Sequence, residues 1–227
     1  MLFEISIDHF KQSTVKSEEY WKQEDRTDYR VEVDHEAKVI LVIGRPTSQG
    51  VDWLDNFDFR VRDKTRKWFP SRNSPRVHNG FLRQYESVRK ILLDLCYKYE
   101  DYAIRCTGYS LGGSWTQIFV QDCLHRWTNI EGKEDRDIKA IFYACGNPWR
   151  WLPKVYRKAL KACTQFVINY WDPVTWMGLL RFKRYGKNVM IGKPWRLYPL
   201  QHHYNQIERA LYERFNKQHH KRLREGD

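Results

Sequence analysis

The stretch Gly108-Tyr-Ser-Leu-Gly-Gly113 decides the expected fold. It follows a strand-like run, Tyr102–Thr107, and opens a helical pattern, Leu111–Trp127. A serine between two glycines at a strand-to-helix junction is typical of a nucleophile elbow, a sharp turn that exposes the hydroxyl group. The glycines let strand and helix approach closely, and the helix N-terminus favours negative charge beside the serine. We therefore expect Ser110 to be a nucleophile; the alternative is a glycine-rich turn without chemistry.

Short apolar runs alternate with amphipathic stretches on both sides of this turn. The expected strands are Arg30–Val33, Lys38–Ile43, Tyr102–Thr107, Ile138–Cys145, Phe166–Asn169 and Asn188–Ile191. The expected helices are Gly80–Tyr99, Leu111–Trp127, Pro153–Ala162 and His203–Phe215. Strands that alternate with helices are typical of parallel pairing through crossover connections. The sequence therefore predicts an α/β fold, with a mostly parallel central sheet and helices on both faces.

Length and composition predict a single domain with a full core. The chain has 227 residues, of which 41% are hydrophobic. We divide it into an N-terminal extension (residues 1–28), a core (29–215) and a basic C-terminal tail (216–227). The first ten residues lack the basic start and long apolar core of a secretory signal, and no apolar run is long enough to span a bilayer. A cytosolic location is expected, with release from the cell by a separate route as the alternative.

Cysteines and charge limit the expected partners. The five cysteines are scattered, without a Cys-x-x-Cys pair, which favours buried thiols in a reducing compartment; no metal or cofactor is expected. The net charge is +12, which favours anionic partners such as acidic lipid surfaces or nucleic acid without choosing between them; no specific nucleic-acid partner is expected. The amphipathic stretch Arg209–Arg224 could dock on an anionic bilayer, or it could be a solvated helix end.

The acid and base that would activate the serine follow it in the chain. In α/β-hydrolases the order is nucleophile, acid, histidine. Asp172 comes directly after an expected strand, and Pro173 fixes the turn behind it. The alternative role for Asp172 is that of an Asx-turn residue. His202 and His203 both precede the last helical pattern, and one of them would take the proton from Ser110.

The region from about Val39 to Leu211 resembles the class 3 lipase family, the fungal triacylglycerol lipase type. The resemblance rests on five blocks in the family's order: Val42-Ile-Gly-Arg-Pro-Thr-Ser, Asp52-Trp-Leu, Val77-His-Asn-Gly-Phe, Gly108–Gly113 and Asn169-Tyr-Trp-Asp-Pro-Val. Five ordered blocks are far more specific than one motif. Pro46 departs from the family pattern, which has glycine there, so it removes an N–H group from this loop.

The resemblance implies roles for further residues. Thr47 and the backbone N–H of Leu111 would form the oxyanion hole, and His78 would support the elbow rather than act as base. The family's histidine has apolar residues two, five and nine positions later. His202 meets this pattern with Tyr204, Ile207 and Leu211, so it is the expected base, with His203 as the alternative.

The resemblance also implies an activity. It predicts hydrolysis of carboxylic ester bonds in lipids, of the triacylglycerol lipase or phospholipase type, through an acyl-serine intermediate held by a Ser-Asp-His triad. Neither metal nor cofactor takes part in such a reaction. Two alternatives stay open: an esterase or thioesterase for non-lipid substrates on the same fold, and a non-catalytic basic protein that binds membrane or nucleic acid.

Overall fold

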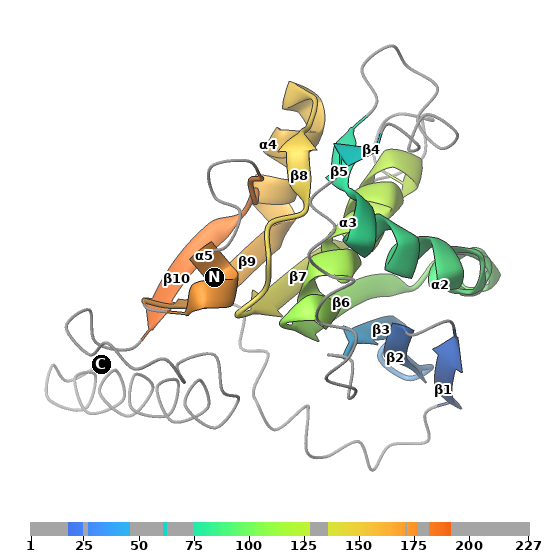
Figure 1. The fold of residues 1–227 in the computed structure, drawn as a ribbon. Helices are drawn as coiled ribbons and strands as arrows, with labels where there is room; N and C mark the ends of the chain where they lie inside the picture. The colour runs from blue at the N-terminus through green and yellow to red at the C-terminus, as the bar shows by residue number, and fades with distance from the viewer. Residues whose placement is uncertain are drawn as a thin grey trace, which may run out of the picture.

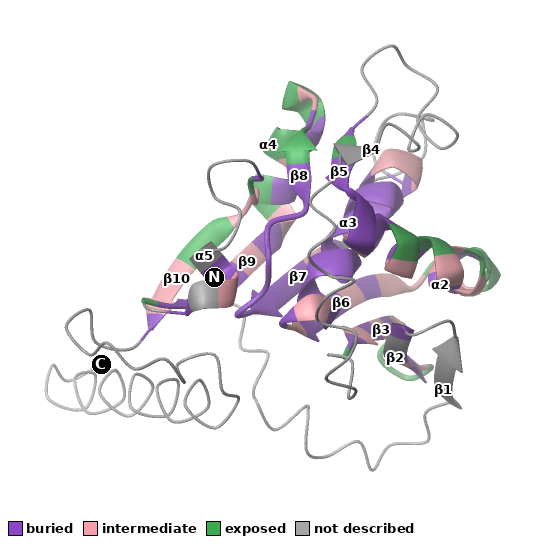
Figure 2. Cartoon of the chain, in the orientation of Figure 1, coloured by how far each residue is buried: buried purple, intermediate pink, exposed green. Residues whose placement is uncertain are grey.

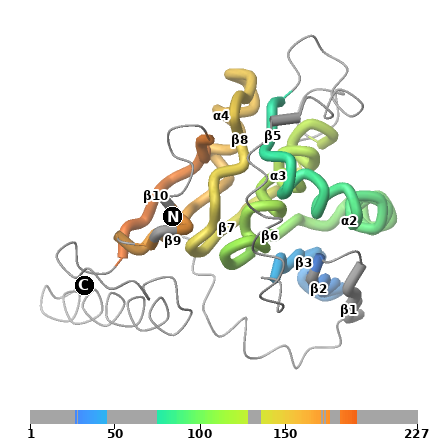
Figure 3. Tube along the Cα trace, viewed as in Figure 1, coloured from blue at the N-terminus to red at the C-terminus, as the bar shows by residue number. Residues whose placement is uncertain are grey.

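A seven-stranded sheet forms the centre of the protein (Figure 1). The computed structural model describes residues 18–24, 27–45, 61–62, 75–127, 136–170, 172–176 and 182–191. The strands, in their order across the sheet, are β1 (Glu18–Glu24), β2 (Thr27–Asp34), β3 (Val39–Gly44), β6 (Ala103–Tyr109), β7 (Ile138–Tyr143), β9 (Thr164–Asn169) and β10 (Lys187–Ile191). The trace therefore runs from blue β2 and β3 through green β6 to orange β10 (Figure 3).

Most strand pairs of this sheet are parallel. Strands β1, β2 and β3 pair antiparallel, whereas β3 with β6, β6 with β7, β7 with β9, and β9 with β10 pair in parallel. The carboxyl ends of β3, β6, β7, β9 and β10 thus lie along one edge, which we call the carboxyl edge. The register places Gly44 opposite Gly108 and Asn169 opposite Ile191. The expected α/β-hydrolase architecture with a mostly parallel sheet is confirmed. The predicted helix His203–Phe215 lies outside the described residues, so helices on both faces stay a prediction.

Three long helices pack side by side along one face of the sheet. They are α2 (Asn79–Lys98), α3 (Leu111–Trp127) and α4 (Lys154–Cys163). Helix α3 lies between the other two and is buried along almost its whole length (Figure 2). Helix α2 buries residues three and four positions apart, such as Tyr85, Val88 and Leu92, which is the pattern of a helix with one apolar face.

The main core lies between these helices and the sheet. Its largest fully buried side chains include Trp115 and Phe119 of α3, Tyr85 of α2 and Phe142 of β7. A smaller apolar cluster is formed by strand residues that alternate with those of the main core. It contains Ile141, Tyr143, Ala144, Val167 and Ile191, with Tyr109 packed against it. Since neighbouring positions of β7 point to opposite faces, the two clusters lie on opposite sides of the sheet.

Some strands differ from the expectation. The sheet begins at Glu18, whereas residues 1–28 were expected to be an extension; β1 is an edge strand of mostly polar residues, so it shows no apolar run. A second, three-stranded sheet contains β4 (Val61–Arg62), β5 (Arg76–His78) and β8 (Trp149–Trp151), none of which was predicted. Strand β8 leads into α4.

Two predictions from composition concern thiols and membrane spans. All five cysteines are free thiols, four of them buried and Cys163 half-buried, as expected. None of the described helices is long and apolar enough to cross a membrane.

Candidate active site

The turn between β6 and α3 holds Ser110 in a strained conformation. Its φ is 53°, in the left-handed region that residues with a side chain rarely adopt. The Ser110 N–H donates to the carbonyl oxygen of Tyr143 at 3.0 Å, and the Ser110 carbonyl accepts from the Ser114 N–H at 3.2 Å. Such strain costs about 1–3 kcal/mol and persists where the surroundings impose it, typically at functional sites. Ser110 therefore has the backbone of a nucleophile elbow.

Glycines allow β3, β6 and α3 to meet at this turn. A Cβ atom on Gly112 would lie 2.2 Å from the carbonyl oxygen of Gly44, and one on Gly108 would lie 2.7 Å from the Cα of Gly113. A Cβ on Gly113 would lie 2.8 Å from the Cβ of Cys145. Most of the blocking atoms belong to the backbone, so they cannot turn aside. The glycines of the motif are therefore required by packing, as the sequence predicts.

Side chains behind the turn support it. The Ser114 hydroxyl donates to the Ser110 carbonyl at 3.0 Å and accepts from the Gly146 N–H at 2.9 Å. The Phe81 ring lies against Gly146, and His78 stacks on Phe81 with ring centroids 4.2 Å apart. His78 is buried, with 2% of its surface exposed. These contacts fit the supporting role expected for His78.

Asp172 is fully buried just beyond the end of β9, at the start of α5 (Pro173–Trp176). Its Oδ1 accepts from the N–H of Val174 at 2.9 Å and from that of Thr175 at 3.4 Å. Its Oδ2 accepts from the Thr175 hydroxyl at 2.9 Å. The carboxylate thus caps α5, so the Asx-type interaction considered above is present. The same contacts fix the carboxylate in one orientation, which the acid of a triad also needs.

Ser110 and Asp172 lie at the same edge of the sheet, two strands apart. Ser110 follows β6, and Asp172 follows β9, with β7 between them. The Ser110 N–H donates to Tyr143 at the end of β7, and the Ala144 N–H donates to the carbonyl of Val167 in β9 at 3.0 Å. Two strand spacings amount to about 10 Å, which a histidine side chain between the two groups can bridge.

Burial and charge shift the ionisation of groups around Asp172. Burial raises the pKa of the Tyr109 hydroxyl above its usual range, and the charge of Asp172 raises it further. Burial raises the pKa of the Cys145 thiol to about 12. Both groups are therefore neutral at pH 7, and neither is a nucleophile there.

Three residues near Asp172 were not anticipated. The Thr175 hydroxyl donates to the carboxylate, while Asn147 and Arg184 donate to the Thr175 carbonyl at 3.4 and 2.9 Å. Thr175 had a local signal, because aspartate followed by proline is typical of a helix start whose side chain accepts from the next turn. Asn147 and Arg184 are distant in the chain, so no sequence signal connects them with Asp172.

Other predicted site residues lie outside the described residues. These are Thr47, His202 and His203, so their roles stay predictions. Strand β3, which precedes Thr47 in the chain, and strand β10, which precedes the two histidines, both end at the carboxyl edge. Thr47 comes three residues after Gly44, which is paired with Gly108, and β10 ends at Ile191 beside Asn169.

The oxyanion hole and the absence of a metal stay predictions as well. Leu111 is the first residue of α3, where backbone N–H groups have no acceptor within the helix. Its proposed contribution is consistent with this place. Among the described residues, no cluster of three histidine, cysteine, aspartate or glutamate side chains could hold a metal ion.

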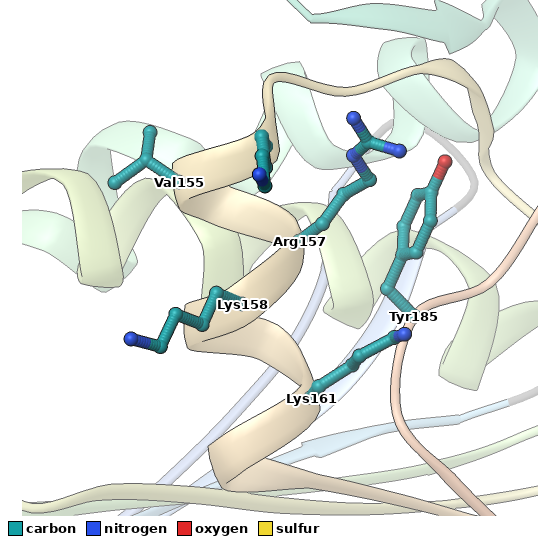
Figure 4. Close-up of a pocket in the computed structure, with 6 residues that line it drawn as sticks. Val155, Arg157, Lys158, Lys161 and Tyr185 are labelled. Atoms are coloured by element: carbon teal, nitrogen blue, oxygen red, sulfur yellow. The ribbon is translucent and has the colours of Figure 1, made fainter.

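An open hollow lies away from the carboxyl edge, between α4 and Tyr185 (Figure 4). It has a volume of about 640 Å³ and is lined by Lys154, Val155, Arg157, Lys158, Lys161 and Tyr185. Figure 4 shows Arg157 and Lys161 extending toward Tyr185, whereas Val155 and Lys158 project from the other side of α4. Thr164 at the start of β9 donates to the Tyr185 carbonyl at 2.9 Å. The hollow is therefore at the amino ends of β9 and β10.

Comparisons with known proteins agree with this architecture. A family model described as lipase (class 3) matches residues 41–178. Phospholipase A1-IIbeta of Arabidopsis thaliana is 32% identical over an alignment of 131 residues that covers 48% of this chain and 31% of that protein. The chain therefore spans less than a third of this relative.

Solved structures show the same fold. The Rhizomucor miehei lipase–propeptide complex aligns with a TM-score of 0.58 and 20% identity, over 78% of this chain and 56% of that one. A triacylglycerol lipase whose catalytic centre is formed by a serine protease triad aligns with a TM-score of 0.59 and 19% identity, over 78% and 66%. The motif order, the carboxyl-edge geometry and the family match lead to one conclusion: the chain belongs to the class 3 lipase family.

Proposed function

We propose that this protein is a serine hydrolase that cleaves carboxylic ester bonds of lipids through a triad of Ser110, Asp172 and His202. The observation that carries the proposal is the pairing of a strained Ser110 with a buried Asp172 at one edge of the sheet. Membership of the class 3 lipase family supports it, as does the triad named for a lipase of the same fold.

In the first half of the proposed reaction, the Ser110 hydroxyl attacks the carbonyl carbon of the ester. His202 takes the hydroxyl proton as the new C–O bond forms, and the carbonyl oxygen becomes negative. Asp172, whose carboxylate is already fixed by Val174 and Thr175, orients the imidazole and balances its charge. The imidazolium then gives its proton to the leaving alcohol when the old C–O bond breaks.

The second half releases the acid. Water attacks the acyl-serine, its proton passes to His202, and collapse of the tetrahedral intermediate returns a proton to Ser110. The oxyanion of both intermediates is held by the N–H of Leu111 at the start of α3 and by Thr47. Each such donor contributes about 3 kcal/mol to lowering the barrier.

We propose phospholipids as the substrate class within the lipids. The name of the Arabidopsis relative, a phospholipase A1, supports this choice, and so does the net charge of +12, which attracts anionic head groups. Triacylglycerols are the next candidate, because the solved neighbours include a triacylglycerol lipase.

Substrate series test this proposal. Purified wild type and Ser110→Ala are assayed with p-nitrophenyl esters from acetyl to palmitoyl and with phospholipid and triacylglycerol emulsions. We expect rates that rise with chain length, hydrolysis of phospholipid above triacylglycerol, and loss of all activity in Ser110→Ala. His202→Ala, compared with His203→Ala, identifies the base. Wild-type rates no higher than those of Ser110→Ala on every ester would contradict the proposal.

Peripheral contact with an anionic bilayer is a further part of the proposal. The predicted docking segment Arg209–Arg224 lies outside the described residues, but α4 supports such contact. Lys154, Arg157, Lys158 and Lys161 recur at three- and four-residue spacing on α4, which contains no acidic residue. Among the described residues none of the four forms an ion pair. These side chains project from more than one side of α4 (Figure 4) and line the hollow near Tyr185, not the active site, so they add attraction only.

Vesicle binding in a Ser110→Ala background tests this contact without hydrolysis. Changing Lys154, Lys158 and Lys161 to glutamine is expected to weaken binding to anionic vesicles about a hundredfold, since each lysine contributes about 1 kcal/mol. The control, with glutamine at the exposed lysines 38, 90 and 98, removes the same charge elsewhere. Equal losses in the two variants would show that only net charge matters and would refute a role of α4.

A further inference from the structure

Arg184 lies beside the buried acid of the active site. Its Nη2 donates to the Thr175 carbonyl at 2.9 Å, and its guanidinium carbon lies 5.9 Å from the centre of the Phe166 ring. Burial lowers the pKa of the guanidinium, while a Cys145 thiolate, which forms only at high pH, and the charge of Asp172 act in the opposite direction. The cation is therefore largely withdrawn from water and within electrostatic reach of Asp172.

The hydrogen bond from Arg184 reaches Asp172 through a single residue. Thr175 accepts from Arg184 with its carbonyl and donates to the Oδ2 of Asp172 with its hydroxyl at 2.9 Å. Asn147, which is 3% exposed, also donates to this carbonyl, at 3.4 Å. A displacement of Thr175 would therefore turn the carboxylate.

The helix that carries Thr175 depends on these donors. Helix α5 has four residues, a single turn that is not stable by itself in water. Its last turn contains no basic residue, so the charge that favours a helix C-terminus comes from elsewhere in the chain. Arg184 supplies it at the Thr175 carbonyl. Asp172 at the start of α5 and Arg184 near its end thus hold the turn from both sides.

Charge gives Arg184 a second effect on the same carboxylate. A carboxylate with no exposed surface loses its hydration, and this loss is offset by hydrogen bonds and by nearby positive charge. Val174 and Thr175 provide the hydrogen bonds, and Arg184 provides positive charge within reach. The positive charge of Arg184 also acts on a base bound to Asp172, where it disfavours protonation. Removal of this charge would therefore favour the protonated form of the base.

We propose that Arg184 is a positioning residue for the acid of the triad, holding Asp172 in place through Thr175 and balancing its charge. The inference rests on the proposed hydrolase function. Arg184 contacts neither the substrate nor the reacting atoms in this scheme, so its effect is on kcat and on the pH dependence, not on KM.

Two substitutions of Arg184 separate the effect of its charge from the effect of its hydrogen-bond geometry. Arg184→Gln keeps a side-chain N–H donor for the Thr175 carbonyl but removes the charge, whereas Arg184→Lys keeps the charge but loses the planar guanidinium. Lys183→Gln is the matched control, since it removes one charge from the exposed neighbouring residue. The kcat and KM of all variants are measured with a soluble p-nitrophenyl ester between pH 5 and 9, together with their melting temperatures.

For Arg184→Gln we expect a kcat about tenfold lower and an acid limb of the kcat/KM profile displaced by about 0.5–1 pH unit to higher pH. The sign follows from the charge: without the cation, the base binds its proton more tightly and is deprotonated only at higher pH. For Arg184→Lys the acid limb stays in place while kcat falls. For Lys183→Gln neither changes.

Two results would overturn the inference. The first is that the wild type is active and Arg184→Gln has the same acid limb as the wild type, with a lower melting temperature. Arg184 would then act only on stability. Equal displacement of the acid limb in Lys183→Gln would assign the effect to net charge. An inactive wild type would instead remove the proposed function, and this inference with it.

Discussion

Substitution of Gly112 by alanine tests the geometry of the nucleophile turn. Alanine within a helix normally stabilises it by about 1 kcal/mol relative to glycine. Here the added Cβ would lie 2.2 Å from the carbonyl oxygen of Gly44 and 2.6 Å from the backbone nitrogen of Arg45. Real contacts keep at least 3.0 Å, and both obstacles are backbone atoms of β3 and the residue after it. Strand β3 and helix α3 must therefore separate.

The cost follows from overpacking. Forcing a methyl group into a filled site costs about 1–3 kcal/mol, and rigid backbone neighbours favour the upper end. At roughly 2–4 °C per kcal/mol for a chain of this size, a cost of about 3 kcal/mol is expected to lower the melting temperature of Gly112→Ala by about 6–12 °C. The same separation moves Leu111 relative to Thr47 in the predicted oxyanion hole. A shift of about 1 Å there lowers kcat about a hundredfold.

Thermal unfolding and ester hydrolysis measure the two effects. Gly146→Ala is the control, because the atoms nearest to its Cβ would be side-chain atoms of Phe81 and Ser114, at 3.1 Å, which can move more readily than backbone. Gly44→Ala forces β3 and α3 apart from the other side, because its Cβ would lie 2.4 Å from the carbonyl oxygen of Gly112. The double variant with alanine at both positions should therefore lose less stability than the two single variants lose in sum. Full stability and full activity in Gly112→Ala would show that contact between β3 and α3 does not require glycine at this position.

Two further predictions concern stability. Asp122→Ala leaves the buried Tyr85 hydroxyl and the Arg89 guanidinium without the carboxylate they contact at 2.6 and 2.7 Å, so urea titration should show a loss of about 3–5 kcal/mol. Since Asp122 lies about three helical turns from Ser110, the kcat of the remaining folded protein should stay unchanged. Burial raises the pKa of Cys145 from 9.0 to about 12, so its contribution to stability is complete below pH 9 and is lost as the pH approaches 12. The urea midpoint should fall above pH 9, less steeply in Cys145→Ala; a midpoint independent of pH up to 11 would contradict this.

The parts of the fold that the sequence predicts best have a strong local pattern. Helix α3 has the predicted bounds, Leu111–Trp127, because the glycine-rich turn marks its start. The buried strands β7 and β9 begin within two residues of their expected starts, since continuous apolar runs are typical of parallel strands covered on both faces. Strand β1 escaped prediction because an edge strand satisfies only one neighbour and tolerates polar residues on both faces.

In the candidate site, too, some residues could be predicted from the local sequence and others could not. The position of Ser110 and that of Asp172 could be inferred, because each follows a recognisable strand and the carboxyl ends of parallel strands meet. The support of Asp172 by Arg184 could not, since Arg184 lies twelve positions later, shortly before β10, and only a tertiary contact brings its guanidinium to the Thr175 carbonyl. Local patterns thus identify reactive groups, whereas the residues that hold them depend on tertiary contacts.

Covalent labelling tests the central claim, the nucleophilic role of Ser110, most directly. A fluorophosphonate reacts with an activated serine when the hydroxyl oxygen displaces fluoride from phosphorus. Wild type and Ser110→Ala are incubated with it at pH 7.5 and analysed by peptide mass spectrometry. We expect one phosphonate adduct, on Ser110, formed in parallel with loss of ester hydrolysis and absent from Ser110→Ala. A folded wild type that hydrolyses esters but carries no adduct at Ser110, or carries it on another residue, would show that Ser110 is not the nucleophile.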